Sequence, residues 1–188
     1  KGIKSMNTQL ELTTERLTIR RICKDDAEAV FKYRSDAVTN EYQGWLPKTI
    51  NDVYDFVKRV PTDINIPGTW FQVVIIISET DEVVGDIGIH FLDTDSRQVE
   101  IGYTLAKNHH GKGYATEGVK RTVDFLFNEL DKHRVTASID PGNHSSIKLM
   151  ERLGFRKEAH FKESLFIKGK WVDDVVYAIL KKEWNVLY

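Results

Sequence analysis

One segment of this sequence constrains the fold more than any other, because it joins a strand, a glycine-rich turn and a helix in immediate succession. Residues 98–106 have the pattern of a strand, and the turn runs from His110 to Glu117. From Ala115 to Leu130 apolar residues recur every three or four positions, which predicts an amphipathic helix. Backbone N–H groups at such a helix start face outward at the positive end of the helix dipole, where phosphate binds. The segment therefore predicts a phosphate-bearing ligand.

The rest of the chain alternates strands and helices. Short turns at Asp81–Glu82 and Asp93–Ser96 predict an antiparallel meander over residues 70–106. Apolar periodicity predicts helices over 24–34 and 49–60, and a third short helix that Gly154 ends as its C-terminal cap. The other strands are expected at 16–22, 134–139, 155–166 and 171–180. We therefore expect a mixed α/β (α+β) fold with about seven strands.

Composition limits the organisation and the location of the protein. A chain of 188 residues with 41% hydrophobic residues is expected to form one domain over residues 1–188, with residues 1–10 either frayed or left from a tag. The net charge of -1 gives no general attraction to nucleic acid or membranes. Cys23 is the only cysteine, and no apolar run is long enough to span a bilayer. We expect a cytoplasmic protein.

Several familiar sites are absent from the sequence. The turn lacks the Gly-Lys-Ser/Thr ending of a P-loop, and the third glycine of a dinucleotide-binding turn would fall on Thr116. His109, His110 and His144 lack the spacing of metal ligands, so no metal is expected. No base stands beside Cys23 that would make it a nucleophile.

Several short motifs together resemble one family. The chain is similar to the GCN5-related N-acetyltransferase (GNAT) superfamily, in the branch of ribosomal-protein N-terminal acetyltransferases, from residue 16 to 184. The resemblance implies a split, mostly antiparallel sheet with helices on both faces and acetyl-CoA as co-substrate. The motifs that carry it are Glu100-Ile101-Gly102-Tyr103, the turn from His110 to Glu117, Asn143 with Ser146, Leu153-Gly154-Phe155, and Trp171 with Asp173 and Tyr177.

The resemblance implies two groups of residues that bind acetyl-CoA. The first is the turn, where the family pattern of Gln or Arg, then Gly, then Gly or Ala is matched by His110, Gly113 and Ala115. His110 departs from that pattern, so we expect weaker phosphate affinity with an intact backbone cradle. The second is the strand before the turn, whose free backbone groups would pair with the pantetheine arm. The expected contacts are Tyr103, Thr104, Leu105, His110, Gly111, Lys112, Gly113, Tyr114, Ala115 and Thr116, with Asn143 and Ser146.

The same resemblance suggests the catalytic residues. Glu100 is the candidate base, although a carboxylate on a strand is often merely solvated or paired with a cation. Asn143 is assigned to an amide of the cofactor arm and Ser146 to the thioester sulfur, while Asn143 is equally suited to cap a helix. No placed nucleophile is evident, so direct transfer without an acyl-enzyme is expected.

Three hypotheses remain for the function, and the resemblance favours the first. The first two are acetylation of a protein N-terminus and acetylation of a small amine such as an aminoglycoside or polyamine; the third is a non-catalytic module that binds coenzyme A. A groove lined by Tyr42 and Trp45 would favour a peptide, and a pocket rich in acidic residues a polycation. The acidic residues available for that pocket are Glu41, Asp52, Asp55 and Asp63. Either a monomer or a homodimer is compatible with the sequence.

Overall fold

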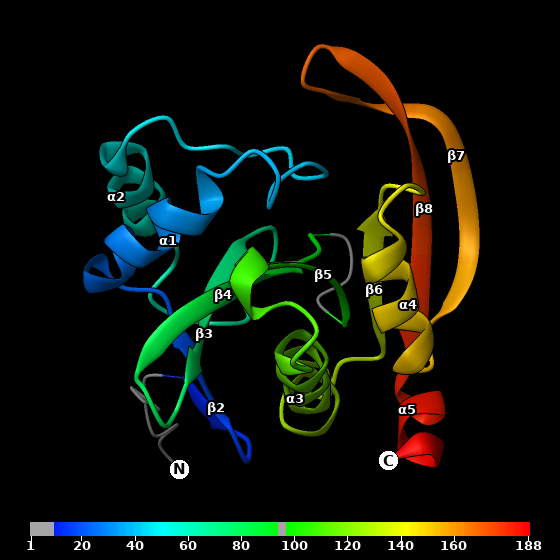
Figure 1. Ribbon diagram of the computed structural model, residues 1–188. Helices are drawn as coiled ribbons and strands as arrows, with labels where there is room; N and C mark the ends of the chain where they lie inside the picture. Colours follow the sequence, from blue (N-terminus) through cyan, green and yellow to red (C-terminus); the bar gives the residue numbers. More distant parts are fainter. Residues whose placement is uncertain (1–9, 94–96) are drawn as a thin grey trace.

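A computed structural model describes residues 10–93 and 97–188, and its central feature is one eight-stranded sheet (Figure 1). The strand order is β1-β2-β3-β4-β5-β6-β8-β7. The strands are β1 (Glu11–Thr13), β2 (Leu17–Arg21), β3 (Trp70–Ile77), β4 (Glu82–Phe91), β5 (Gln98–Leu105), β6 (Arg134–Ile139), β7 (Arg156–Ile167) and β8 (Lys170–Leu180). The helices are α1 (Ala27–Arg34), α2 (Ile50–Arg59), α3 (Tyr114–Asn128), α4 (His144–Arg152) and α5 (Lys181–Leu187), with short 3-10 helices at Lys24–Asp26 and Lys107–His109.

The sheet is mostly antiparallel, as the sequence predicts. Among the described pairs, β5 and β6 alone are parallel. The eighth strand, β1, was not expected because its three residues are too few to show a pattern. The predicted turn at 93–96 falls largely on residues 94–96, outside the described residues.

The sheet is split between β5 and β6. The two strands pair only where residues 98–100 face residues 134–136. Beyond Glu100, β5 stays bonded to β4 but has no strand on its other side. The Ala106 N–H bonds the Val84 carbonyl, so by strand alternation the N–H and C=O groups of Tyr103 and Leu105 face the open side.

Helices cover both faces of the sheet, which confirms that expectation. On one face, Tyr33 and Arg34 of α1 bond the buried carboxylate of Asp86 on β4. On the other face, α3 approaches so closely that a Cβ on Gly118 would lie 3.3 Å from the Ile75 side chain. Asp86 pairs with Val74, the neighbour of Ile75, so the two helices pack on opposite faces (Figure 1).

Local sequence signals explain where two of the helices stop and start. Thr49 caps α2 by accepting a hydrogen bond from the Asp52 N–H, and the Asp52 carboxylate accepts one from the Thr49 N–H. Gly154 ends α4 with φ of 85°, a left-handed conformation that suits glycine. The C-terminal helix α5 was missed, although its Trp184 is only 1% exposed. No helix within 10–93 or 97–188 is long and apolar enough to cross a membrane.

Candidate active site

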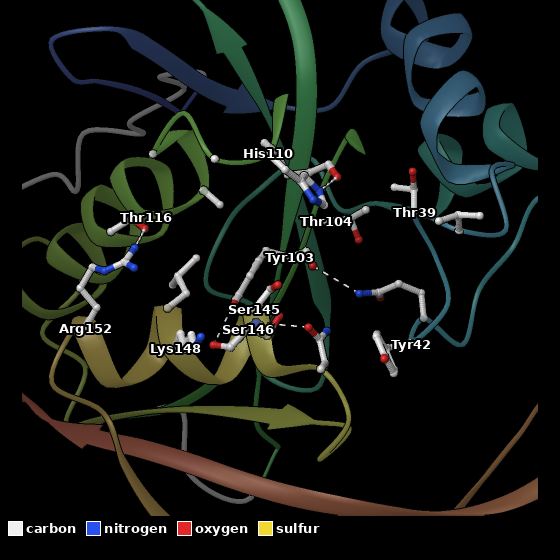
Figure 2. A pocket seen from close by; sticks show the side chains of 18 residues that line it. Thr39, Tyr42, Tyr103, Thr104, His110, Thr116, Ser145, Ser146, Lys148 and Arg152 are labelled. Carbon is white, nitrogen blue, oxygen red and sulfur yellow. Dashed lines mark hydrogen bonds between the residues drawn. The ribbon is translucent and has the colours of Figure 1, made fainter. Parts of the chain in front are cut away.

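A cavity of about 500 Å³ opens at the split of the sheet, between β5, the glycine turn and α4 (Figure 2). The segment between α1 and α2 forms its remaining wall. The β7–β8 hairpin, at the edge of the sheet opposite β1, contacts this segment. Its Lys168 donates hydrogen bonds to the carbonyls of Asn40 and Glu41. The cavity is lined by Val38, Thr39, Tyr42, Gln43, Tyr103, Thr104, Leu105, His110, Gly111, Gly113, Ala115, Thr116, Asn143, Ser145, Ser146, Lys148, Leu149 and Arg152.

This lining brings together most of the cofactor contacts expected from the sequence. Lys112 and Tyr114 do not line the cavity. The Lys112 carbonyl instead accepts a hydrogen bond from Arg16, and the Tyr114 ring lies under the guanidinium of Arg16. Glu100 also lies outside the lining, on the opposite face of β5 from the Tyr103 side chain.

The open edge of β5 presents backbone groups to the cavity. Gln43 donates a hydrogen bond to the Tyr103 carbonyl at 3.3 Å, and His110 Nε2 bonds the Leu105 carbonyl at 2.8 Å. Because a carbonyl only accepts, His110 Nε2 carries a hydrogen. The hydroxyl of Thr104 is buried without a hydrogen-bond partner in the described structure. This edge can therefore pair with an extended ligand that offers amides.

His110 thus has a contact that its sequence position did not reveal. Its ring points back to β5 instead of replacing a long Gln or Arg side chain at the turn (Figure 2). Gly111 and Gly113 adopt φ of 77° and 84°, which leaves their backbone exposed to the cavity. The backbone of these two glycines therefore lines the cavity while the His110 ring is engaged elsewhere.

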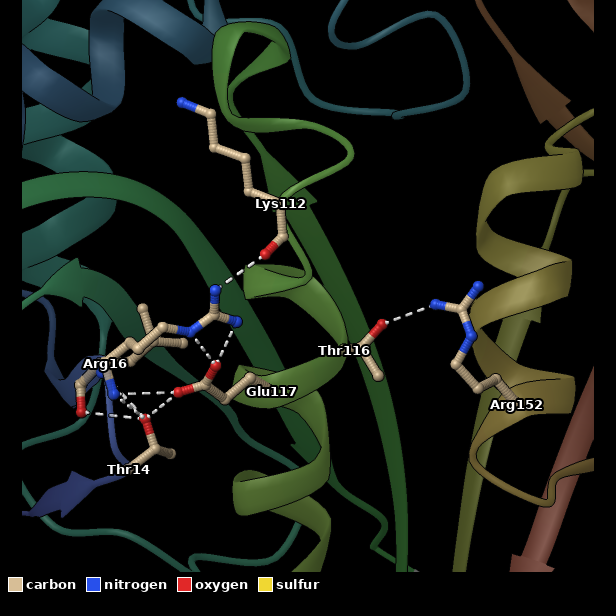
Figure 3. Close-up of polar contacts among 7 residues, drawn as sticks. Thr14, Arg16, Lys112, Thr116, Glu117 and Arg152 are labelled. Carbon is tan, nitrogen blue, oxygen red and sulfur yellow. Dashed lines mark hydrogen bonds and ion pairs between the residues drawn. The ribbon is translucent and has the colours of Figure 1, made fainter.

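Two cations on α4 complete the site and were missed by the sequence analysis. Lys148 and Arg152 both line the cavity, and Arg152 donates a hydrogen bond to the Thr116 hydroxyl at 3.1 Å (Figure 3). Their spacing of four residues places them on one helix face, a signal visible in the sequence. No carboxylate of residues 10–93 or 97–188 lines this cavity, so the lining matches a polyanion such as a pyrophosphate.

Asn143 caps α4, which is one of the two roles that the sequence suggested for it, beside binding the cofactor arm. Its Oδ1 accepts a hydrogen bond from the Ser146 N–H at 3.1 Å. The side-chain amide nitrogen remains available to donate into the cavity that both residues line. Tyr103 donates from its hydroxyl to the Ser146 carbonyl, and burial raises the pKa of Tyr103 to about 12. Capping and ligand binding are therefore compatible roles for Asn143.

Glu100 on β5 lies on one face of the sheet in a row with His90 on β4 and Trp70 on β3. Its Oε2 lies 3.8 Å from Nδ1 of His90 on β4, and the His90 ring stacks on Trp70 with ring centroids 4.7 Å apart. Burial raises the pKa of Glu100, His90 opposes this rise, and Asp174 adds to it. Next to Glu100 on the same face, a Cβ on Gly102 would meet no heavy atom within 4 Å. A partly buried carboxylate beside open space suits a base.

Two of the acidic residues considered for the acceptor, Asp52 and Asp55, line a second pocket with Trp45, where Lys48 and Arg59 balance their charge. Tyr42 lines the cavity, whereas Trp45 stacks on Phe56 of α2. Asp52 caps α2 and Asp55 pairs with exposed Lys58. Neither these two nor Glu41 or Asp63 lines the cavity. No cluster of three or more potential metal ligands occurs among the residues that the structure describes.

Comparison with known proteins places these features in a family. Residues 16–156 match the acetyltransferase (GNAT) domain family. The chain is 36% identical over 174 residues to an uncharacterized N-acetyltransferase p20 of Bacillus licheniformis, covering 92% of this chain and 97% of that protein. It is also 25% identical to the [ribosomal protein uS5]-alanine N-acetyltransferase of Escherichia coli, covering 98% and 97% of the two chains.

A solved structure agrees with the sequence matches. The crystal structure of a GNAT-family acetyltransferase from Bacillus anthracis superposes with a TM-score of 0.82 at 30% identity, covering 93% of this chain and all of that one. With a split sheet, a glycine turn before α3 and a family match over most of its length, the chain belongs to the GNAT family of N-acetyltransferases.

Proposed function

We propose that this enzyme moves an acetyl group from acetyl-CoA directly to the N-terminal amine of a protein. The observation that carries the proposal is the unpaired edge of β5, which runs through Tyr103 and Leu105 toward the glycine turn along one cavity. A strand edge with no neighbouring strand can pair with a pantetheine arm as with an added strand, provided that Gln43 and His110 give up the carbonyls of Tyr103 and Leu105. The turn beyond it would take the pyrophosphate.

The charges of the cavity support the same orientation of the donor. Arg152 lies at the turn end, where the phosphates would sit, and Lys148 lies one helical turn before it on α4. Ser146 lies beside Tyr103, and Asn143 lines the same cavity. We assign the Asn143 amide to the pantetheine arm and the Ser146 hydroxyl to the departing sulfur. A hydroxyl there would donate to the thiolate as the carbon–sulfur bond breaks.

Glu100 is proposed to prepare the amine for attack. An α-amino group has a pKa of about 8 and is mostly protonated at neutral pH, so it must lose a proton before it reacts. Glu100 would take that proton directly or through one water in the open space above Gly102. The neutral nitrogen then bonds to the thioester carbon and the carbon–sulfur bond breaks. The second proton that the nitrogen loses passes by way of the Ser146 hydroxyl to the sulfur, so coenzyme A leaves as a thiol. No acyl-enzyme is required.

A protein N-terminus is the preferred acceptor on two grounds. A relative that aligns over nearly the full chain is named for acetylating the alanine of a ribosomal protein. In addition, the acidic residues that a polyamine would need do not line the cavity. A small amine is the second candidate, because amine deprotonation by Glu100 serves it equally.

The test is a turnover assay with acetyl-CoA and three groups of acceptors, namely N-terminal peptides of ribosomal proteins, polyamines and aminoglycosides. We expect kcat/KM for at least one peptide to exceed that for every small amine by about a hundredfold or more. The matched control is the same peptide with a blocked N-terminus and a free lysine, which should not react. Faster turnover of a small amine would contradict the proposed acceptor. Turnover of none while coenzyme A binds would favour a non-catalytic module.

A further inference from the structure

Arg16 lies in the turn between β1 and β2, outside the cavity, yet it binds the glycine turn from behind (Figure 3). Its Nε donates to Glu117 Oε2 at 2.7 Å and its Nη2 donates to the same oxygen at 2.5 Å. Its Nη1 donates to the Lys112 carbonyl at 3.0 Å. The Arg16 side chain therefore binds the residue before Gly113 and also Glu117, which lies in the first turn of α3.

Glu117 is fixed from several directions. Thr14 donates from its hydroxyl to Oε1 at 2.6 Å, and the backbone N–H of Arg16 donates to the same oxygen at 3.1 Å. Partial burial opposes ionisation of Glu117, but the hydrogen bonds from Thr14 and Arg16 outweigh it and lower its pKa. Glu117 is thus a charged and immobile anchor for Arg16.

The bond to Lys112 has a directional consequence for Gly113. In a planar trans peptide the carbonyl and the following N–H point in opposite directions. Because the Lys112 carbonyl points to Arg16, the Gly113 N–H points away from Arg16. Gly113 lines the cavity and Arg16 does not, so this N–H is aimed toward the cavity. It bonds no backbone carbonyl within residues 10–93 and 97–188.

We infer that Arg16 is a positioning residue that aims the Gly113 N–H at the pyrophosphate, an inference that rests on the proposed function. Arg16 does not itself contact phosphate, since Nε, Nη1 and Nη2 are all engaged by the protein and Glu117 balances its charge. Arg16 also lies directly behind Gly113, where an added Cβ would be 3.3 Å from Nη2. The role requires a guanidinium, which can bridge a carboxylate and a carbonyl at once.

The test compares Arg16→Lys and Arg16→Gln with the unchanged enzyme, using acetyl-CoA and S-acetylpantetheine, which lacks the pyrophosphate. For both variants we expect KM for acetyl-CoA to rise about tenfold, with kcat within about twofold, because one charge-assisted bond to the turn is lost. Activity with S-acetylpantetheine should be unchanged. Glu117→Gln removes the carboxylate that holds Arg16, so it should also raise KM for acetyl-CoA. The double variant with Arg16→Gln and Glu117→Gln should raise this KM no further than Arg16→Gln alone.

The matched control is Arg156→Lys. Arg156 has the same 44% side-chain exposure and also pairs with two carboxylates, Glu158 and Glu183, but it lies away from the cavity. It should leave both activities unchanged. An unchanged KM in the Arg16 variants, or an equal loss with both donors, would overturn the inference. A loss with acetyl-CoA that vanishes with 3′-dephospho-acetyl-CoA would also overturn it, by showing direct contact with the 3′-phosphate.

Failure of the proposed function gives a different result. If the unchanged protein does not bind coenzyme A in calorimetry, the donor assignment itself is wrong. If Arg16→Lys and Arg16→Gln fail to fold, the measurement rests on Glu117→Gln, for which an unchanged KM for acetyl-CoA contradicts the positioning role.

Discussion

Glu100 and His90 face each other across two paired strands, with Oε2 of the carboxylate 3.8 Å from Nδ1 of the imidazole. Nδ1 of His90 is buried and has no hydrogen-bond partner in the described structure. The imidazole therefore has no competing contact at that atom, and it acts on Glu100 by lowering the pKa that burial raises. This relationship affects the pH range over which Glu100, the proposed base, is ionised.

The first prediction concerns the pH dependence of kcat/KM. A carboxylate base works only when ionised, so activity should fall as pH decreases through the raised pKa of Glu100. Replacing His90 by Gln removes the group that lowers this pKa, so the acid limb should move to higher pH. The negative charge of Asp174 raises the pKa of Glu100, so Asp174→Asn should move the limb to lower pH. Profiles from about pH 5 to 9 would measure these shifts.

Glu100→Gln provides the reference for those profiles. It should lower kcat at neutral pH by about a hundredfold or more. The deficit should shrink at high pH, where the acceptor amine loses its proton without help. Identical profiles for the unchanged enzyme and Glu100→Gln would show that another group is the base.

The second prediction concerns the glycine turn. Gly113→Glu would put a side chain on a left-handed residue that disfavours any side chain, with its Cβ 3.3 Å from Nη2 of Arg16. The new carboxylate would compete with Glu117 and the Lys112 carbonyl for Arg16, and so would disturb the turn at the proposed pyrophosphate site. We expect coenzyme A affinity in calorimetry to fall at least about tenfold with the fold retained. Gly169→Glu is the control, because Gly169 has φ of 80° in the β7–β8 hairpin and lies away from the glycine turn. This variant has a similar backbone strain and should bind coenzyme A with unchanged affinity. Unchanged affinity of Gly113→Glu would refute the phosphate assignment.

The third prediction concerns the two cations of α4. Arg152→Ala and Lys148→Ala should each raise KM for acetyl-CoA about fivefold, and the increase should diminish at high salt, which screens charges. Arg121→Ala is the control, because Arg121 pairs with Glu129 on α3 and does not line the cavity. If all three variants behaved alike, Arg152 and Lys148 would not be phosphate contacts.

Much of this arrangement could be predicted from the sequence, and the exceptions have physical causes. Several elements have strong local signals. Thr49 stands at the start of α2, and Gly154 stands at the end of α4. The glycine turn and the C-terminal hairpin are marked by their own glycines. The contacts of Arg16 with Lys112 and Glu117 span about a hundred residues, so no local pattern could reveal them. His110 was recognised as a departure, but its bond to the Leu105 carbonyl depends on how the turn folds back.

The fourth prediction concerns stability rather than catalysis. Asp86 accepts hydrogen bonds from Tyr33, Arg34 and Gln72 beneath α1, and only 1% of it is exposed. Asp86→Asn would leave the Arg34 charge buried without its partner, so the free energy of unfolding should fall by about 3 kcal/mol in urea titration. Lys58→Ala, which breaks an exposed pair with Asp55, should leave the midpoint unchanged. Equal midpoints for both variants would argue against this network as a stabilising element.

The most direct test of the site is amide hydrogen exchange of β5 with and without coenzyme A. If the pantetheine arm pairs with the open edge, the amides of Tyr103 and Leu105 should exchange at least about tenfold more slowly at saturation. Those of Gly102 and Thr104 face β4 and should not change. Alternating protection along this strand is the predicted result. Unchanged exchange at both Tyr103 and Leu105 with bound coenzyme A would contradict the account.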